Sequence, residues 1–242
     1  MAHNNPVRDS VLQVIGNTPV VRLRKVVTSS MADVLLKLEY YNPTGSYKDR
    51  MALAMIEGAE ARGELRAGMR VVEWTGGSTG SSLAMVCAIK GYRFTPISSD
   101  GFAKEKLQTM RLFGADLEIF PAEGGKLVPE LYQRMKSRAE ELARQPATFY
   151  TDQFHNADAI RAYMEIGREL VEQAGTSLAA FCGGVGGRDA RRRVACAEGS
   201  RVPSAHCGAR ACNFASAHNW ERRAAPRRGD RRRIPAATPE AG

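Results

Sequence analysis

The 242-residue chain lacks the features that mark membrane-spanning and exported proteins. No run of eighteen or more apolar residues occurs, which excludes a membrane-spanning helix. The N-terminus, "MAHNNPVRDS", has no basic-then-apolar pattern of a signal peptide. The five cysteines form no tight framework, which is typical of a reducing compartment. These absences predict a cytoplasmic protein without membrane contacts.

Leucine and lysine are both absent from the last part of the chain, and this part carries nearly all the excess charge. From Gly187 onward there are 13 Arg, no Lys and 5 acidic residues, a net of +8 out of +9 for the whole chain. The segment 187–242 has no helical or alternating pattern and few large apolar residues, so it cannot bury enough surface to offset chain ordering. The sequence predicts a disordered tail behind a nearly neutral body.

Two binding functions can be considered for this tail. Arg-rich blocks can bind nucleic acid, but no aromatic residues alternate with the arginines as stacking platforms, so we expect no nucleic-acid partner. Its cysteines and histidines match no familiar zinc spacing, and we expect no metal site. They are Cys196, His206, Cys207, Cys212 and His218.

Residues 1–186 show a repeated alternation of strand and helix patterns. The apolar spacing predicts strands over 33–40, 70–74, 92–99, 115–120, 148–154 and 177–185. It predicts helices over 47–63, 81–91, 104–114, 128–145 and 156–175. This alternation indicates an α/β fold with an open, largely parallel sheet. Ligands of such sheets bind in loops at the carboxyl ends of the strands.

The stretch "NPTGSYKDR" (42–50) places Lys48 just after a turn and at the start of a predicted helix. A lysine there is ordinarily a solvated surface charge. The helix dipole disfavours a cation at this end by about 0.3–1 kcal/mol, which lowers a lysine pKa by less than one unit. A nucleophilic amine at neutral pH would also need burial. Position alone therefore leaves the role of Lys48 open.

Together with four further stretches, "NPTGSYKDR" resembles the cysteine synthase and cystathionine β-synthase family, which are fold type II pyridoxal-phosphate enzymes. The stretches follow the family order: "VIGNTPVVRLRK" (14–25), "EWTGGSTGSSLAMVCAIKGY" (73–92), "FGADLEIF" (113–120) and "TDQFHNADAI" (151–160). The resemblance implies two α/β domains of the tryptophan synthase β-like kind. Residues 39–148 would form the smaller domain, and 1–38 plus 149–186 would belong to the larger one.

The resemblance also implies roles for particular residues. Lys48 would form a Schiff base with pyridoxal 5'-phosphate and later move the substrate α-proton. The substrate carboxylate would be held by Gln153 and by a loop comprising Thr75, Gly76, Gly77, Ser78 and Thr79. The glycines of this loop do not match the dinucleotide spacing G-x-G-x-x-G.

The 75–79 loop departs from the usual family sequence Thr-Ser-Gly-Asn-Thr at two positions. Ser78 replaces the asparagine that meets the cofactor's ring hydroxyl, and Gly76 replaces a serine. Ser78 can still make one hydrogen bond to the cofactor. Gly184 and Gly186, at the end of the last predicted strand, would complete the cofactor site.

The implied activity is β-replacement on an activated serine, O-acetylserine or O-phosphoserine, by a sulfur donor. The product would be cysteine or S-sulfocysteine, and family members are usually homodimers. A serine or threonine dehydratase and a cystathionine β-synthase are alternatives that share the cofactor. A further alternative is an inactive remnant that only binds a partner.

After Gly186 the resemblance ends, where the family has Gly-Thr-Gly-Gly-Thr around the cofactor phosphate. If two bases were lost, or one gained, just after the Gly186 codon, the bases that now encode Gly187 to Ala190 would read Thr-Gly-Gly-Thr in the restored frame. We therefore hypothesise that 187–242 is a frameshifted reading of a GC-rich gene, which would explain many Arg without Lys. Without its phosphate loop, the chain is expected to fold in part and to be weakly active at best.

Overall fold

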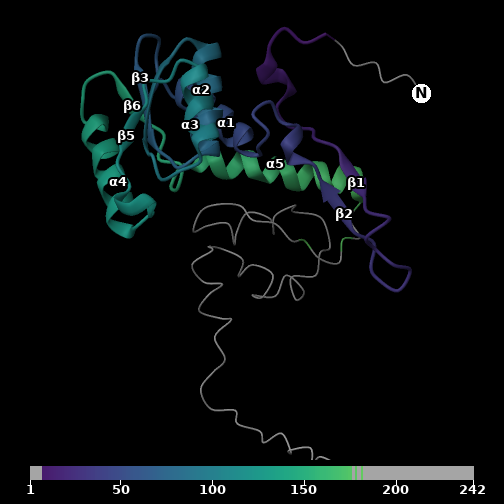
Figure 1. Ribbon diagram of the computed structural model, residues 1–242. Helices are drawn as coiled ribbons and strands as arrows, with labels where there is room; N and C mark the ends of the chain where they lie inside the picture. Colours follow the sequence, from purple (N-terminus) through teal and green to yellow (C-terminus); the bar gives the residue numbers. More distant parts are fainter. Residues whose placement is uncertain (1–6, 176–177, 179–180, 182–242) are drawn as a thin grey trace, which may run out of the picture.

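The computed structural model describes residues 7–175, 178 and 181, and its centre is a four-stranded parallel sheet (Figure 1). The strands are β3 (Arg70–Trp74), β4 (Arg93–Ser99), β5 (Glu118–Phe120) and β6 (Thr148–Tyr150), in the order β5-β4-β3-β6. All three pairings are parallel, as the alternation of strands and helices predicts. The predicted strand over 148–154 is wrong beyond 150, because residues 151–154 form a loop at the sheet edge.

Helices cover both faces of this sheet. One face is covered by α1 (Lys48–Ala61), α2 (Ser78–Lys90) and α3 (Lys104–Leu112), and the other by α4 (Pro129–Ala143) (Figure 1). The long helix α5 (Ala157–Ala174) packs along α1 and reaches the N-terminal segment. The predicted helix over 81–91 begins three residues earlier, at Ser78, because the small residues 78–80 adopt the first helical turn.

The central strand β3 sends successive side chains to two separate apolar cores. Val71 lies in the core that α1, α2 and α3 close, whereas Val72 lies in the core beneath α4. Both valines have no solvent exposure. This alternation is expected of a strand covered on both faces. By the same period, Glu73 points back to the side of α1 and α2, and Trp74 to the side of α4.

The N-terminal segment forms a separate two-stranded antiparallel hairpin. Its strands are β1 (Val20–Arg22) and β2 (Leu35–Lys37), so the predicted strand over 33–40 is wrong after Lys37, where a short 3-10 helix, η2 (Glu39–Tyr41), begins. Two further short 3-10 helices are η1 (Val11–Val14) and η3 (Glu123–Gly125).

A buried ion cluster ties this N-terminal segment to α1 and α5. The guanidinium of Arg50 donates to Glu39 at 2.8 Å and to Glu169 at 2.5 Å, and Lys37 Nζ also reaches Glu169 at 2.5 Å. Burial alone would raise the pKa of Glu169, but the hydrogen bonds from Arg50 and Lys37 outweigh it and lower that pKa to about 2. Removing one partner would leave a buried charge unpaired.

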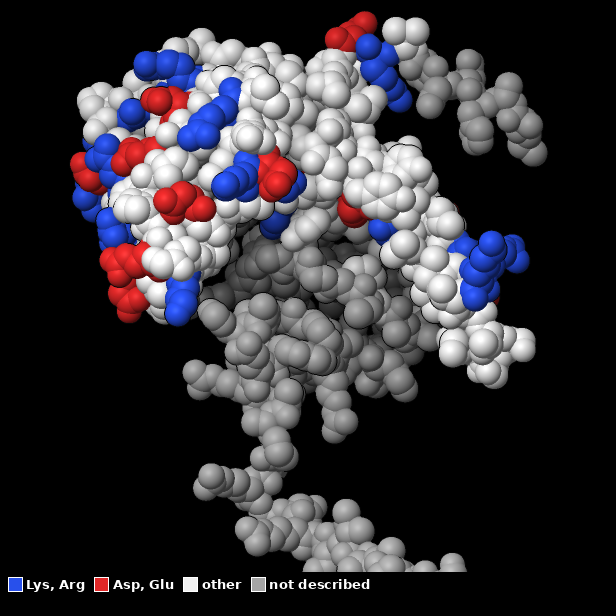
Figure 2. Space-filling view, viewed as in Figure 1, with Lys and Arg blue, Asp and Glu red and all other residues white. Residues whose placement is uncertain are grey.

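Acidic and basic side chains are interspersed on the face of the described part seen in Figure 2, in keeping with a nearly neutral body. Among the helices that the structure describes, none is both long enough and apolar enough to cross a bilayer.

Four features predicted above lie outside the described residues. They are the strand over 177–185 apart from residues 178 and 181, Gly184 and Gly186, the 187–242 tail with its cysteines and histidines, and the proposed frameshift point.

Candidate active site

A cavity of about 420 Å³ opens where β3 and β6 end and α1 begins. This is the position at which open α/β sheets bind ligands. Every described residue that the sequence analysis assigned to a site lines this cavity: Lys48, Thr75, Gly76, Gly77, Ser78, Thr79 and Gln153. The remaining lining residues are aromatic, and the sequence analysis did not single them out: Trp74, Phe102, Tyr132 and Phe154.

Lys48 is the first residue of α1, and a tight turn places it there. Gly45, with φ of 73°, closes the turn by donating its N–H to the Asn42 carbonyl at 2.7 Å. The buried carboxylate of Asp49 accepts the backbone N–H of Thr44 at 2.7 Å and the Thr44 hydroxyl. These local bonds hold the Pro-Thr-Gly-Ser turn against the helix, and they fix the direction in which Lys48 leaves the backbone.

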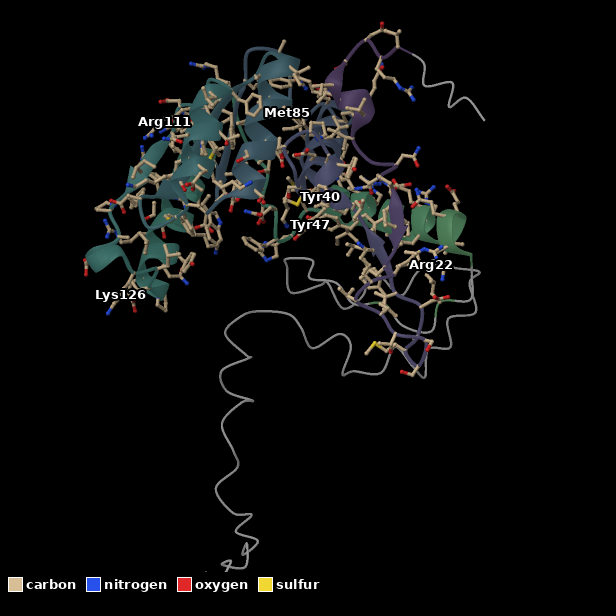
Figure 3. All side chains as sticks on the ribbon, turned by 45° about the vertical axis from the view of Figure 1, so that its right-hand side comes forward. Arg22, Tyr40, Tyr47, Met85, Arg111 and Lys126 are labelled. Carbon is tan, nitrogen blue, oxygen red and sulfur yellow. The ribbon has the colours of Figure 1, made fainter. Side chains whose placement is uncertain are left out.

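The amine of Lys48 is held among aromatic rings. Its Nζ donates to the Tyr163 hydroxyl at 3.0 Å and lies 4.7 Å from the centroid of the Tyr47 ring. Tyr163 comes from α5, is only 4% exposed, and was not identified from the sequence. Figure 3 shows Tyr47 between the part of the molecule that carries Lys126 and the hairpin that carries Arg22. The faces of aromatic rings attract an ammonium group, and these contacts hold the side chain of Lys48 at the edge of the cavity that it lines.

The 75–79 loop joins β3 to α2 and presents polar groups to the cavity. Thr75 Oγ1 accepts the backbone N–H groups of Gly77 at 3.3 Å and Gly80 at 3.2 Å, which holds the turn closed. Ser78 and Thr79 stand in the first turn of α2, where N–H groups lack partners within the helix. Such a helix start, with hydroxyls beside it, suits an anionic group such as a carboxylate.

Gly76 is glycine because an aromatic ring occupies the space beside it. A Cβ built at this residue would lie 2.3 Å from Cε1 of the Phe102 ring. The departure from the family serine at this position therefore has a structural counterpart: the Phe102 ring lies where that serine side chain would be. The ring also lines the cavity, so an apolar surface replaces a hydroxyl.

The aromatic side chains of the cavity form one connected wall. The ring centroids of Trp74 and Phe154 are 5.2 Å apart, and those of Trp74 and Tyr132 are 6.2 Å apart. Phe102 extends the wall at 6.2 Å from Tyr132. These spacings are typical of tilted and edge-to-face aromatic contacts. The four residues come from separate segments, so the wall could not be seen in the sequence.

A buried carboxylate, Glu73, lies directly beneath the site. It has no solvent exposure and accepts hydrogen bonds from the Thr151 hydroxyl at 2.6 Å and from the Gln153 backbone N–H at 3.0 Å. Burial raises the pKa of Glu73 to about 7, although the hydrogen bonds from Thr151 and Gln153 act in the opposite direction. The sequence analysis missed this residue; the signal available was a lone acidic residue in the otherwise apolar strand "RVVEW".

The fold and the cavity together define a class of protein: an α/β protein with a small-molecule site built from an amine, a helix start and an aromatic wall. The family of pyridoxal-phosphate dependent enzymes matches residues 11–189. Because this match spans most of the chain, the protein belongs to that family. Its fold and its cofactor class are therefore the ones that the sequence motifs indicated.

Known members of the family are similar to this chain over part of their length. A cysteine synthase of Staphylococcus aureus is 41% identical over 180 residues, which are 74% of this chain and 56% of that enzyme. An O-ureido-L-serine synthase of Streptomyces lavendulae is 39% identical over 155 residues, covering 62% and 44% of the two chains. A crystal structure of a cysteine synthase from Entamoeba histolytica superimposes with a TM-score of 0.67 at 29% identity, covering 77% and 55%. The chain thus spans about half the length of these relatives.

The described residues fit the reactive end of pyridoxal phosphate. A primary amine, the only kind of side chain that can bond to its aldehyde as a Schiff base, faces a cavity bordered by Ser78 and Thr79 hydroxyls. An aromatic wall on the same cavity suits a flat ring. The residues expected around the phosphate, Gly184 and Gly186, lie outside the described part of the chain.

Proposed function

We propose that this protein replaces the β-substituent of an activated serine with a sulfur nucleophile. The activated serine would be O-acetylserine or O-phosphoserine, and the product cysteine or S-sulfocysteine. One observation carries the proposal: Lys48, the 75–79 loop and Gln153, from three separate segments, line a single cavity. The similarity to cysteine synthases supports the choice of sulfur as the attacking atom.

Each part of the cavity would do one task. When bound, pyridoxal phosphate supplies the electron sink that stabilises negative charge at the substrate Cα. Lys48 Nζ would hold the cofactor and then take the proton from Cα, and the Tyr163 hydroxyl, at 3.0 Å from Nζ, would restrict the position of the amine. Ser78 would hydrogen-bond the ring end of the cofactor. The loop and Gln153 would bind the substrate carboxylate and so orient the leaving group.

Reduction with borohydride tests the assignment of Lys48. The purified chain is incubated with pyridoxal phosphate, reduced and digested, and the labelled peptide is mapped. We expect label on Lys48 and its loss in Lys48→Ala. Lys106→Ala is the matched control, because Lys106 lies beside the same loop, its Cγ 3.6 Å from the position of a Cβ at Gly77, and should leave the label intact. Scattered label, or none, would mean that this chain is an inactive remnant.

Product analysis then separates the alternatives that share the cofactor. O-Acetylserine and O-phosphoserine are each offered with sulfide and with thiosulfate. Cysteine or S-sulfocysteine would support β-replacement. A keto acid released without a sulfur donor would identify a dehydratase, and cystathionine formed from homocysteine would identify a cystathionine β-synthase.

Two aspects of organisation remain proposals. We propose that 39–148 forms the smaller domain, with 1–38 and 149–186 in the larger one, and that the protein is a homodimer. The contact of α5 with β1 supports a link between the N-terminal segment and the part after β6. Light scattering that gives twice the mass of one chain would support the dimer, and the mass of a single chain would contradict it.

A further inference from the structure

The hydrogen bonds of Gln153 are all directed at the protein. Its Nε2 donates to Glu73 Oε1 at 3.3 Å and to the Trp74 carbonyl at 3.1 Å, and its Oε1 accepts the Thr79 hydroxyl at 2.8 Å. Both hydrogens of the amide are therefore used, and so is the hydroxyl hydrogen of Thr79. In this arrangement neither side chain has a donor left for an incoming carboxylate.

The bond to Glu73 is the one that a change of charge would release. It is the longest of the three, and it depends on the carboxylate being a strong, ionised acceptor. When Glu73 takes up a proton, the attraction for this amide hydrogen weakens, while the bond to the Trp74 carbonyl is unaffected. Gln153 can then turn one N–H toward the cavity.

Electrostatic repulsion between the substrate carboxylate and the Glu73 carboxylate also favours protonation of Glu73. A substrate carboxylate bound by Thr79 or Gln153 would lie one side chain away from the Glu73 carboxyl group. Two carboxylates at a shared site in a poorly solvated region do not both stay ionised, and one of them takes up a proton. The substrate carboxyl is the stronger acid and stands nearer to solvent, so Glu73 is the group that takes it up.

We propose that Glu73 is a positioning residue that couples binding of the substrate carboxylate to uptake of one proton from solvent, by releasing Gln153 toward the ligand. The inference rests on the proposed function, because it requires that Gln153 or Thr79 contacts a substrate carboxylate. Glu73 itself does not line the cavity.

The charged and titratable groups near Glu73 set the pH at which it would take up the proton, and that pH is near neutral. Asp152, in the loop after β6, raises the pKa of Glu73, and Tyr150 on β6 is the other nearby titratable side chain. The first two turns of α2 carry no ionisable residue, and Lys48 is the cation that lines the cavity from α1. His155 contacts Asp152 instead of Glu73. With a pKa of about 7, Glu73 is half protonated at neutral pH.

Binding of L-serine by the full 242-residue chain tests the coupling. The dissociation constant is measured by NMR titration at pH 6 and at pH 8 without pyridoxal phosphate, so that the L-serine ammonium keeps its proton. We expect binding about tenfold weaker at pH 8, because a group with a pKa near 7 loses about nine-tenths of its protonated form over this range. In Glu73→Gln, a neutral isostere, the pH dependence should disappear. Glu118→Gln is the matched control, since Glu118 is a half-buried strand glutamate away from the cavity that pairs with Arg138.

A measurement on the unaltered chain covers the case in which Glu73→Gln does not fold. Calorimetry of L-serine binding, again without pyridoxal phosphate, in two buffers with different ionisation enthalpies counts the protons taken up. At pH 7 we expect about half a proton per bound L-serine, and more at pH 8. The side-chain amide signals of Gln153 should also titrate near pH 7 without ligand.

The possible failures can be told apart. Binding with no proton uptake, or with the same pH dependence in Glu73→Gln, would overturn the coupling and leave the proposed function standing. Absence of L-serine binding at every pH, together with absence of label on Lys48, would overturn both.

Discussion

The Nζ of Lys48 and the hydroxyl of Tyr163 lie 3.0 Å apart, although 115 residues separate them in the chain. The contact joins the start of α1 to the middle of α5 and places an amine at the wall of the cavity. Tyr163 is almost fully buried, and its hydroxyl also donates to Met51 Sδ at 2.8 Å. This pair therefore links the packing of two helices to the position of the reactive nitrogen.

Tyr163→Phe should retain the ring packing and lose the hydroxyl's bonds to Lys48 and Met51. We expect the free energy of unfolding, measured by urea denaturation, to fall by about 1–2 kcal/mol, because the usual net value of one hydrogen bond is about 1 kcal/mol. Tyr92→Phe is the matched control, because its hydroxyl bonds Glu60 at 2.8 Å at a more exposed position, where the loss should be smaller. An equal loss of unfolding free energy in both variants would contradict the expectation that the buried Lys48–Tyr163 hydrogen bond contributes more than the exposed one.

Gly76→Ser, which restores the usual family residue, should be tolerated only when Phe102 is made small. Alone it places a side chain against the Phe102 ring and should destabilise the protein by about 1–3 kcal/mol. In Phe102→Ala the same serine should cost much less, so the two changes should be non-additive in a double-mutant cycle. The control is Gly77→Ser, whose Cβ would meet only the flexible Lys106 side chain. Additive effects would show that the ring does not restrict this position.

Two glycine-to-alanine changes in helices should have opposite signs. At Gly58 a Cβ would lie 2.3 Å from Oδ2 of Asp158, a buried carboxylate that pairs with Arg62 at 2.8 Å. Gly58→Ala should therefore destabilise the protein by about 2 kcal/mol. At Gly167 on α5 no other atom lies within 4 Å of the Cβ position, so Gly167→Ala should stabilise the helix by up to about 1 kcal/mol. Thermal unfolding of the two variants checks the signs, and a gain in stability for Gly58→Ala would contradict the packing argument.

Stability should depend on pH through Glu73. Its pKa in the folded protein is raised from 4.5 to about 7, so its contribution to stability is fully present below pH 4.5 and is lost as the pH rises through 7. The loss is on the order of 3 kcal/mol at its upper limit. In Glu73→Gln this pH dependence should be absent, and the difference between the two urea denaturation series isolates it. A wild-type minus variant difference that stays constant from pH 5 to pH 8 would contradict the raised pKa.

Glu169 contributes pH dependence of the opposite sign. Its pKa is lowered to about 2, so the stability it provides is present above pH 4.5 and is lost as the pH falls toward 2. Arg50→Lys should weaken this ion cluster, because a lysine cannot form the paired contacts that the guanidinium makes with Glu39 and Glu169. We expect the variant to unfold at a higher pH during acid titration, followed by circular dichroism. An unchanged acid midpoint would contradict this account.

Local sequence patterns predicted most of the helices and strands, and the family resemblance pointed to polar residues that line one cavity in the structure. Alternating strand and helix patterns predicted the parallel sheet, and the stretches around Lys48 and the 75–79 loop predicted two sides of the cavity. The strands and helices can be read because turn residues, helix starts and apolar periods involve residues close together in the chain, whereas the roles of Lys48 and the 75–79 loop are implied by the family resemblance. Two boundaries differ from the predicted ones: Ser78 and Thr79 belong to α2, and β6 ends at Tyr150.

Only the tertiary structure decided which distant side chains surround the polar groups. Tyr163, Phe102 and Glu73 reach the site from three different elements and have no motif that marks them. Their importance follows from burial and contact. The Tyr163 hydroxyl contacts the Lys48 amine, the Phe102 ring occupies the space of a serine side chain, and the Glu73 carboxyl group has no solvent exposure. Such properties depend on what the folded chain packs around each group, because the same side chain has different chemistry when exposed and when buried.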